Sequence, residues 1–304
     1  MIKRLLNAIK EPNKLFLYFA EKGCFDCLND KIFLRMKYHA KTKKRLNIDI
    51  PETFNEKLQW LKLYDRNPEY TVMVDKYLAR KYIAERIGEE YLIPLIGVWD
   101  SPKEIDFEAL PDRFAVKCNH NSGLGMCICT DKTKLDVNEV RKELEKGLNQ
   151  NYYLTGREWP YKDVPRNVIA EQFLESDPGG LTDYKIHCFN GVPKFILVCC
   201  DRFSQSGLTE DFYTVEWEHM KIKRPDIPNA SVAVSKPEKL DEMLKLAKKL
   251  SEGIPFIRID FYFVNGKIYF SELTFYPASG FEGFEPSEWD KTFGEWLTLP
   301  DKQK

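Results

Sequence analysis

The hydrophobic pattern of this chain changes its period near residue 90, and this change limits the folds that the chain can adopt. Before that point, apolar residues recur at intervals of three and four, which favours helices across residues 1–90. After it, short segments alternate between apolar and polar residues, as half-buried strands do. Two helical stretches, Val137–Gln150 and Lys239–Gly253, divide these segments. We therefore expect a mixed α+β chain that begins with helices.

About eight strands are expected, and Asn-Gly pairs indicate how some of them are connected. The expected strands are Tyr91–Trp99, Arg113–Cys118, Gly125–Thr130, Val168–Leu174, Tyr184–Asn190, Pro193–Cys200, Ile257–Val264 and Lys267–Leu273. Asn190-Gly191 and Asn265-Gly266 each lie between two consecutive strands, and Asn-Gly readily adopts the positive φ of a two-residue hairpin turn. Since hairpins join antiparallel neighbours, the sheets are expected to be antiparallel.

The composition excludes several classes of function. The 304 residues include 46 Lys and Arg against 47 Asp and Glu, so the net charge is −1 and no overall field attracts a nucleic acid. The longest apolar runs, Tyr91–Trp99 and Phe195–Cys200, are far shorter than the roughly 20 residues of a membrane-spanning helix. Lys10 and Glu11 interrupt the first apolar stretch, which argues against a secretory signal. We expect a cytoplasmic protein of about two domains.

Two features near the N-terminus leave alternatives open. Cys24 and Cys27 form a CxxC pair, but a zinc site needs four ligands and no second pair follows. Free thiols, most of them buried, are therefore the preferred interpretation of the eight cysteines. Residues 31–45 hold seven Lys or Arg and no acidic residue. This basic segment is either a solvated helix face or a docking site for an anionic polymer or membrane head groups.

The strongest chemical signal lies on the last expected hairpin. Arg258 and Asp260 alternate on its first strand, and Glu272 and Thr274 alternate on its second. Two carboxylates and a hydroxyl on adjacent strands suit Mg²⁺, and an arginine beside them suits phosphate oxygens. The alternative is a surface salt bridge on a hairpin.

Lys117 ends an expected strand and is followed by a loop of small residues, 119–126. Such a loop can hold polyphosphate with its backbone N–H groups and the lysine ammonium, although the GK[ST] ending of a Walker A loop is absent. The alternative is an ordinary hairpin turn. His120, within the loop, is expected to be a hydrogen-bond partner rather than a catalyst.

The expected strand from Val168 ends in polar residues, and Asp183, Lys185 and His187 then share one face of the next strand. This polar face beside an apolar strand suits a nucleotide, with a carboxylate on the ribose and a lysine on the phosphates. The alternative is a half-exposed edge strand.

Further motifs accompany these candidates. They are Phe54–Leu61, Leu63–Arg66, Val74–Tyr77, Gly156–Tyr161 and residues 183–191. With the lysine, the glycine loop and the late carboxylates, they resemble the TupA-like ATP-grasp family of bacterial polysaccharide biosynthesis over about residues 45–298. The resemblance implies an ATP-grasp fold with antiparallel sheets in two nucleotide-clamping lobes. The implied boundaries are 1–90 for a helical N-terminal region, 91–170 for the small lobe with the Gly-rich loop, and 171–304 for the large lobe.

The resemblance also implies a set of nucleotide contacts. The phosphates of ATP would be bound by Lys76 and Lys117, with Lys185 pointing toward them, and the loop residues Ser122, Gly123 and Gly125 would close over them. Adenine would face Glu171 and the backbone of Gln172, Phe173 and Leu174. The ribose would be bound by Asp183. Magnesium would be bound by Asp260, Glu272 and Thr274, the last standing where many ATP-grasp ligases have asparagine.

The implied reaction joins a carboxylate to an amine. ATP phosphorylates the acid, the amine displaces phosphate, and the products are an amide, ADP and phosphate. Arg258 would stabilise the transferring phosphoryl group together with Lys117, and Ser279 and Gly280 would hold substrate through backbone amides. Family membership suggests a uronic acid of a surface polysaccharide or its precursor, with an amino acid or amino alcohol as the amine.

Arg157 and Arg202, next to Trp159 and Phe203, are the candidates for binding the acidic sugar, because arginine binds carboxylates bidentately and aromatic rings stack on sugars. The alternative for each is a surface arginine beside a buried aromatic residue. No nucleic-acid partner and no transmembrane segment are expected; a peripheral contact with membrane-bound polysaccharide machinery is the macromolecular partner considered.

Three other functions are weighed against the ligase. A glycosyltransferase would use a nucleotide sugar and often a DxD motif, which is absent. A degenerate ATP-grasp assembly module would bind nucleotide without catalysis, but the retention of Lys117, Asp260 and Glu272 argues against it. A sugar kinase would form ADP whether or not an amine is present.

Overall fold

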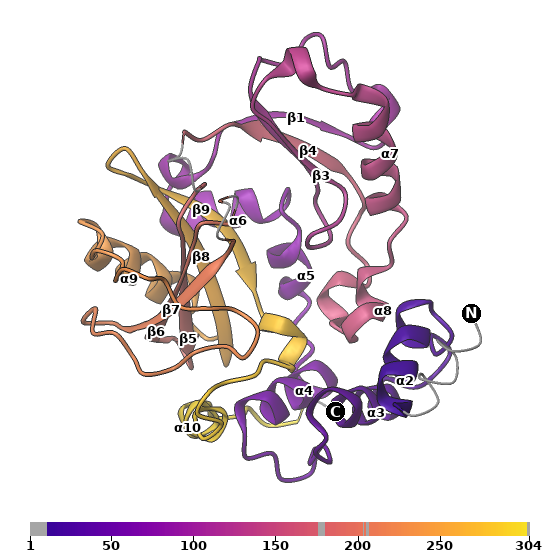
Figure 1. Ribbon diagram of the computed structural model, residues 1–304, viewed down its shortest axis with the longest axis vertical. Coiled ribbons are helices and arrows are strands. Elements are labelled where there is room, and N and C mark those ends of the chain that lie inside the picture. Colours follow the sequence, from indigo (N-terminus) through magenta and orange to yellow (C-terminus); the bar gives the residue numbers. More distant parts are fainter. Residues whose placement is uncertain (1–10, 176–179, 203, 205–206, 303–304) are drawn as a thin grey trace.

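The computed structural model describes residues 11–175, 180–202, 204 and 207–302, and within them two antiparallel sheets combine with helices (Figure 1). The strands are β1 (Leu95–Trp99), β2 (Phe114–Cys118), β3 (Met126–Cys129), β4 (Val168–Gln172), β5 (Asp183–Phe189), β6 (Val192–Cys200), β7 (Thr209–Thr214), β8 (Phe256–Val264) and β9 (Lys267–Thr274). One sheet has the order β1-β4-β2-β3 and the other β7-β6-β5-β8-β9. The expectations of an α+β chain and of antiparallel sheets are confirmed.

Helices occupy the N-terminal part, as its periodicity predicts, and cover the sheets elsewhere. The α-helices are α2 (Pro12–Glu21), α3 (Asp30–Thr42), α4 (Phe54–Tyr64), α5 (Glu69–Val74), α6 (Ala79–Ile87), α7 (Val137–Leu148), α8 (Tyr152–Gly156), α9 (Leu240–Leu250) and α10 (Trp289–Trp296). Short 3₁₀ turns are η1 (Glu89–Tyr91), η2 (Pro102–Glu104), η3 (Lys132–Lys134), η4 (Trp159–Tyr161) and η5 (Pro277–Gly280). In the part of the chain that the structure describes, no helix has both the length and the apolar character that crossing a bilayer requires.

Both Asn-Gly hairpins form as predicted. Asn190 and Gly191 connect β5 to β6 with φ values of 47° and 78°, and Asn265 and Gly266 connect β8 to β9 with φ values of 51° and 73°. Positive φ at both positions matches the right-handed twist of the strands that the turn joins.

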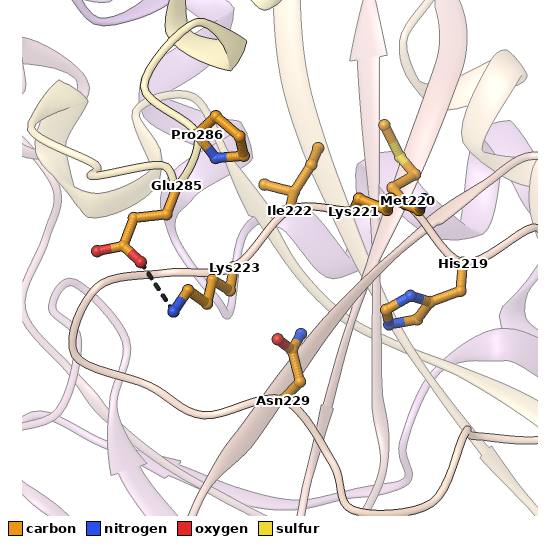
Figure 2. A pocket seen from close by; sticks show the side chains of 8 residues that line it. All are labelled: His219, Met220, Lys221, Ile222, Lys223, Asn229, Glu285 and Pro286. Carbon is orange, nitrogen blue, oxygen red and sulfur yellow. Dashed lines mark ion pairs between the residues drawn. The ribbon is translucent and has the colours of Figure 1, made fainter.

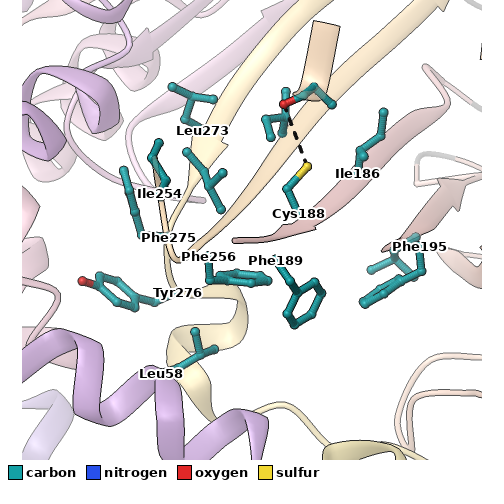
Figure 3. Packing of buried hydrophobic residues seen from close by; sticks show 14 of the residues in the cluster. Leu58, Ile186, Cys188, Phe189, Phe195, Ile254, Phe256, Leu273, Phe275 and Tyr276 are labelled. Atoms are coloured by element: carbon teal, nitrogen blue, oxygen red, sulfur yellow. Dashed lines mark hydrogen bonds between the residues drawn. The ribbon is translucent and has the colours of Figure 1, made fainter. Parts of the chain in front are cut away.

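The larger core joins the N-terminal helices to the five-stranded sheet. Phe189 and Phe256 lie 5.0 Å apart between ring centres, and Leu58 of α4 approaches the same cluster (Figure 3). Phe293 of α10 stacks on Phe195 at 4.5 Å. Helix α9 covers the same sheet (Figure 1). The helical N-terminal region, described from residue 11 onward, therefore shares the core of the larger lobe, because α4 buries its apolar face there.

A smaller core lies between the four-stranded sheet and α7. It includes Phe114 and Val116 of β2 and Leu144 of α7, each almost completely buried. The expected boundary at residues 170 and 171 falls inside β4, whose pairing with β1 and β2 continues through Glu171 and Gln172. The change of sheet therefore lies between Gln172 and Asp183.

Strand β7 was not among the expected strands. Its sequence begins Thr209, Glu210 and Asp211, yet all three side chains are buried. Arg224 pairs with Glu210 at 3.1 Å, and His219 pairs with Asp211 at 2.8 Å. These partners compensate the buried carboxylates, so the strand forms without apolar alternation.

Candidate functional site

The four predicted side chains of the last hairpin lie together on one face of β8 and β9. Asp260 is opposite Glu272, and Arg258 is opposite Thr274. The two-residue turn pairs Val264 with Lys267, so uninterrupted pairing would place Ser271 opposite Asp260 and turn Glu272 to the other face. A bulge after Asp260 adds one residue to β9 and brings Glu272 into the site.

Asp260 is at the centre of an ion-pair network. It is fully buried and accepts Arg258 Nε at 2.7 Å, Arg258 Nη2 at 2.6 Å and Lys185 Nζ at 2.6 Å. Arg258 Nη2 also donates to Glu272 Oε1 at 3.0 Å. Burial raises the pKa of Asp260, but the Arg258 and Lys185 charges outweigh it and lower this pKa to about 2. Asp260 is therefore ionised at neutral pH.

These residues offer oxygen donors that fit a magnesium ion. Thr274 Oγ1 lies 3.4 Å from Glu272 Oε1, which adds a hydroxyl to the two carboxylates. Mg²⁺ takes few protein oxygens and completes its shell with water and substrate phosphates. No cluster of three or more His, Cys, Asp and Glu side chains that could hold a metal by themselves occurs among the described residues. This set of residues fits a Mg²⁺ ion that is bound together with substrate phosphates better than a metal ion that is held by protein side chains alone.

Strand β5 adds a second linked group of charges. Lys185 Nζ lies 3.5 Å from Asp183 Oδ2, and Arg202 Nη2 lies 3.1 Å from the same oxygen. Arg202, predicted for the acidic sugar, is thus placed against the carboxylate predicted for the ribose; its neighbour Phe203 lies outside the described residues. His187 stacks on Phe195 in the core, and burial lowers its pKa to about 3, so it is neutral.

The four-stranded sheet, through Lys117, and the α5–α6 segment, through Lys76 and Arg80, contribute further cations. Lys117 Nζ pairs with Glu171 Oε2 at 2.7 Å, and Arg80 Nη1 lies 3.3 Å from Glu171 Oε1. Lys76 Nζ donates to the Asn121 carbonyl at 2.5 Å. Burial lowers the pKa of Lys76, and the charges of Glu272 on β9 and Glu171 on β4 both oppose this effect. Charged groups from both sheets therefore act on the pKa of one lysine.

The segment expected to face adenine is partly occupied by protein contacts. The Gln172 backbone N–H donates to the Pro94 carbonyl at 2.9 Å. The Arg113 guanidinium lies 5.1 Å from the Phe173 ring centre, and Leu174 is half-buried. The residues after Glu175, 176–179, lie outside the described part of the chain.

The glycine loop is fixed at its base and exposed at its tip. Asn119 donates to Asp75 Oδ1 at 2.9 Å, and Asn121 donates to the Gly147 carbonyl at 3.2 Å. Ser122 and Gly123 are exposed, and Gly123 has a φ of 77° with open space around it. His120 is within hydrogen-bond reach of the Gln150 carbonyl, which confirms its predicted role.

Gly125 and Gly147 allow the loop to pack directly on α7. A Cβ on Gly147 would lie 2.6 Å from the Gly125 Cα, a distance that side chains do not tolerate. We expect Gly147→Ala to weaken ATP binding about 10-fold or more, although alanine favours a helix by about 1 kcal/mol. Binding is measured by calorimetry. The control is Lys142→Ala on the exposed face of α7, and equal ATP affinities of Gly147→Ala and wild type would exclude this role for the packing.

The turn that carries Ser279 and Gly280 is held by α4. Ala278, Ser279 and Gly280 have φ values of 46°, 55° and 65°, a left-handed run that non-glycine residues rarely adopt. Lys62 Nζ donates to the Ser279 carbonyl at 2.8 Å and to its Oγ at 3.0 Å, and Gln59 donates to the Gly280 carbonyl at 2.7 Å. Sequence reasoning assigned no role to Lys62 or Gln59; their only signal is two polar residues on the apolar side of α4.

Arg157 is not brought to the other predicted residues. It is the left-handed cap of α8, with a φ of 56°. Its Nη2 donates to the Phe25 carbonyl at 3.0 Å, and its guanidinium lies 4.5 Å from the Phe33 ring centre. Nη1 also lies 3.6 Å from Asp30. Arg157 thus attaches the α2–α3 connection and α3 to the end of α8, and its buried Nε has no hydrogen-bond partner among the described residues.

Two pockets of about 420 Å³ each lie elsewhere. One is lined by His219–Lys223, Asn229, Glu285 and Pro286, with an ion pair of 3.0 Å between Lys223 and Glu285 (Figure 2). The other is lined by residues around Asn29 and Tyr64. Neither is lined by a predicted site residue.

Comparisons with known proteins agree with the motifs. The sequence model of the family described as TupA-like ATPgrasp matches residues 56–298. Solved structures with remote similarity are D-alanine–D-alanine ligase from Helicobacter pylori (16% identity over 81% of this chain and 69% of that one, TM-score 0.43) and D-cycloserine synthetase DcsG (16%, 74% and 69%, TM-score 0.42).

The ATP complex of D-alanine–D-alanine ligase from Bacillus anthracis is also similar, at 16% identity over 67% of this chain and with a TM-score of 0.38. The chain spans only about half of that ligase, 53%. None of the curated proteins matches this chain. The family match over most of the chain is the observation that identifies it, and the chain belongs to the TupA-like ATP-grasp family of enzymes.

Proposed function

We propose that this protein is an ATP- and Mg²⁺-dependent carboxylate–amine ligase that forms an amide through an acyl phosphate. The observation that carries the proposal is the convergence of cations and carboxylates from both sheets. Lys76 lies under the influence of Glu171 on β4 and of Glu272 on β9. An ATP molecule with its metal is a ligand whose charges match such a mixed set.

The ion pairs of the free protein are expected to be exchanged when nucleotide binds. Glu171 is paired with Lys117, Asp183 with Arg202, and Asp260 with both Lys185 and Arg258. Phosphate oxygens can take over these cations, and Mg²⁺ can take over the carboxylates of Asp260 and Glu272 with the Thr274 hydroxyl. Because each charge changes partner rather than losing one, the desolvation cost of binding stays small.

Each group has a defined role in the phosphoryl transfer. Lys76, Lys117 and Lys185 bind the phosphates, and the exposed tip at Ser122 and Gly123 covers them. Asp260, Glu272 and Thr274 would hold Mg²⁺, which would supply neutralisation of the phosphate charge. Arg258, held by Asp260 at 2.6 Å and 2.7 Å, keeps its guanidinium directed at the transferring group and stabilises the charge that develops there.

The proposed acid is a uronic acid of a bacterial surface polysaccharide or its precursor, and the amine is an amino acid or amino alcohol. Family membership supports this choice. The Ser279–Gly280 turn is proposed to hold substrate, because its left-handed backbone is fixed by Lys62 and Gln59. Arg202 is assigned to the nucleotide side beside Asp183, and Arg157 is left out because its contacts lie with the α2–α3 connection and α3. ATP supply places the reaction in the cytoplasm.

Thermal shift distinguishes the ligase from a glycosyltransferase. ATP with Mg²⁺ at 100 times its Kd should stabilise the wild type by about 2.7 kcal/mol, a shift of several degrees in Tm. Lys117→Ala should abolish this shift, whereas Lys134→Ala, an exposed lysine of the same lobe, should keep it. A shift with UDP-sugars and Mn²⁺ alone, insensitive to Lys117, would replace the ligase by a transferase. ADP release that no amine accelerates would favour a sugar kinase.

A further inference from the structure

Glu158 is a buried carboxylate that the nucleotide and metal assignments leave unused. It follows α8, and only 5% of its surface is exposed. Glu171, Asp183 and Asp260 are also buried, and each has a cation within 4 Å. Glu158 has no such ion pair within the described chain; its hydrogen-bond partner is the Ser279 side chain. An unpaired buried carboxylate is costly unless a proton or a cationic ligand neutralises it.

The two lysines nearest to Glu158 are committed to other acceptors. Lys62 donates to the Gly156 carbonyl at 2.7 Å, to Ser279 and to Gln59 Oε1 at 3.1 Å. Lys37 donates to the Thr155 carbonyl. These bonds fix the backbone just before Glu158 and the Ser279 turn without pairing the Glu158 carboxylate. That carboxylate therefore has no side-chain cation within 4 Å in the described part of the chain.

Glu158 is held against the turn that is proposed to bind substrate. A Cβ on Gly156 would lie 1.9 Å from Ser279 Oγ and 2.9 Å from Glu158 Oε1. The absence of a side chain at Gly156 lets the Ser279 and Glu158 side chains approach the α8 end as they do here. Glu158 and Ser279 thus form one packed unit. Lys62 joins its two segments, because it donates to the Gly156 carbonyl at the end of α8 and to the Ser279 carbonyl in the turn.

This unit lies beside the end of β9, because Ser279 follows Thr274, the last residue of that strand, by five residues. The charges of Arg258 and Glu272 act on the pKa values of Tyr152 and Tyr161, and Arg258 also acts on the pKa of Glu158. The two tyrosine rings lie 4.7 Å apart, and the Tyr161 N–H donates to the Glu158 carbonyl at 3.1 Å. Burial raises the pKa of Glu158, while Lys62, Ser279, Lys37 and Arg258 lower it. A carboxyl whose pKa is raised is a stronger base than an exposed one.

We propose that Glu158 binds the ammonium group of the amine substrate and removes a proton from it, so that the free amine can attack the acyl phosphate. This inference rests on the proposed function and names the part of the site that receives the second substrate. The amine lies between Glu158 and Arg258, with the Tyr152 and Tyr161 rings at its side. A primary amine that carries a positive charge is therefore the expected class of substrate.

The proposed step is balanced in protons and charge. The ammonium gives one proton to Glu158, and the freed electron pair forms the C–N bond with the acyl carbon. The C–O bond to phosphate then breaks, and the departing phosphate takes the second N–H proton. The products are the amide, hydrogen phosphate and a protonated Glu158, which returns its proton to water when the products leave.

Two kinds of nucleophile distinguish the removal of the amine proton by Glu158 from the earlier phosphoryl transfer. Hydroxylamine is largely unprotonated at neutral pH and traps an acyl phosphate as a hydroxamate without needing a base. Wild type is incubated with ATP, Mg²⁺ and glucuronate, galacturonate or their UDP-linked forms. One series contains hydroxylamine, and the other contains single amino acids or ethanolamine. Mass spectrometry quantifies hydroxamate and amide.

We expect Glu158→Gln to lower the ratio of amide to hydroxamate at least about 100-fold, the usual contribution of a general base. Glu158→Asp should restore part of this ratio, and Asp163→Asn, an exposed carboxylate on the same segment, should leave it at the wild-type value. A wild-type ratio in Glu158→Gln would overturn the inference. So would hydroxamate without amide from every amine in the wild type. The absence of hydroxamate in the wild type would overturn the proposed function itself, and this inference with it.

Discussion

Replacing Glu272 by Gln is expected to lower ATP turnover about 10³-fold while leaving the fold intact. The carboxylate is 31% exposed and opposite Asp260, so its loss removes half of the anionic charge offered to Mg²⁺ but only one contact of Arg258. Removing one group that stabilises transition-state charge typically costs 10²- to 10³-fold, or about 3–4 kcal/mol. ADP release measured across a Mg²⁺ titration tests this, and the apparent Mg²⁺ affinity should fall together with kcat.

Asp260→Asn should be as inactive but also less stable. Asp260 is completely buried between Arg258 and Lys185, so its replacement leaves two cations with a neutral partner. The difference in Tm between Asp260→Asn and Glu272→Gln therefore separates the structural from the metal-binding role. Glu288→Gln, at an exposed position of the same lobe, is the control. ATP turnover of Glu272→Gln within tenfold of wild type would remove Glu272 from the metal site.

The sequence predicted which residues lie in this site better than it predicted the strand register that brings them together. Residue types and the Asn-Gly turn indicated that Asp260 and Glu272 lie on paired strands. Regular pairing from that turn, however, places Ser271 opposite Asp260, and only the bulge corrects the register. Nothing in the residues around Ser271 marks a bulge, since no glycine is present there. The face of a strand depends on register, and one extra residue reverses it.

Long-range partners account for the rest of what the sequence could not reveal. Lys62 is bound by Gly156 and Ser279, which lie 94 and 217 residues away in the chain. The motif Gly156–Tyr161 predicts a role for Arg157 in binding the acid and gives none to Glu158. The left-handed cap at Arg157 sends its side chain toward α3, and Glu158 contacts the Ser279 turn instead.

The same reasoning explains β7 and the boundary within β4. Glu210 and Asp211 are buried because Arg224 and His219 reach them from the following loop, so hydrophobic alternation could not reveal the strand. Fold class, hairpins and family were predictable because each depends on local patterns or on motif order. Ion-pair partners depend on tertiary contacts that no local pattern records.

Replacing Arg258 by Met is expected to destabilise the protein by about 3 kcal/mol, because breaking a buried ion pair leaves the partner uncompensated. Asp260 would keep Lys185 at 2.6 Å, but Glu272 would lose its cation. For a chain of this size the Tm should fall by several degrees. ATP turnover should fall about 10³-fold, because the guanidinium stabilises the charge of the transferring phosphoryl group. Denaturation scans and ADP release measure the two effects separately.

Arg258→Lys then tests whether the fork of the guanidinium matters beyond its charge. Arg258 donates from both Nε and Nη2 to Asp260 and from Nη2 to Glu272, and a lysine ammonium cannot reproduce this planar geometry. We expect Arg258→Lys to recover much of the lost Tm while turnover stays at least about 10²-fold below wild type. Arg86→Lys, in an exposed pair with Glu252, should change neither quantity, since exposed pairs contribute little. If Arg258→Lys restored turnover together with Tm, a point charge would be sufficient, and the role of Arg258 would be to hold Asp260 and Glu272 in place.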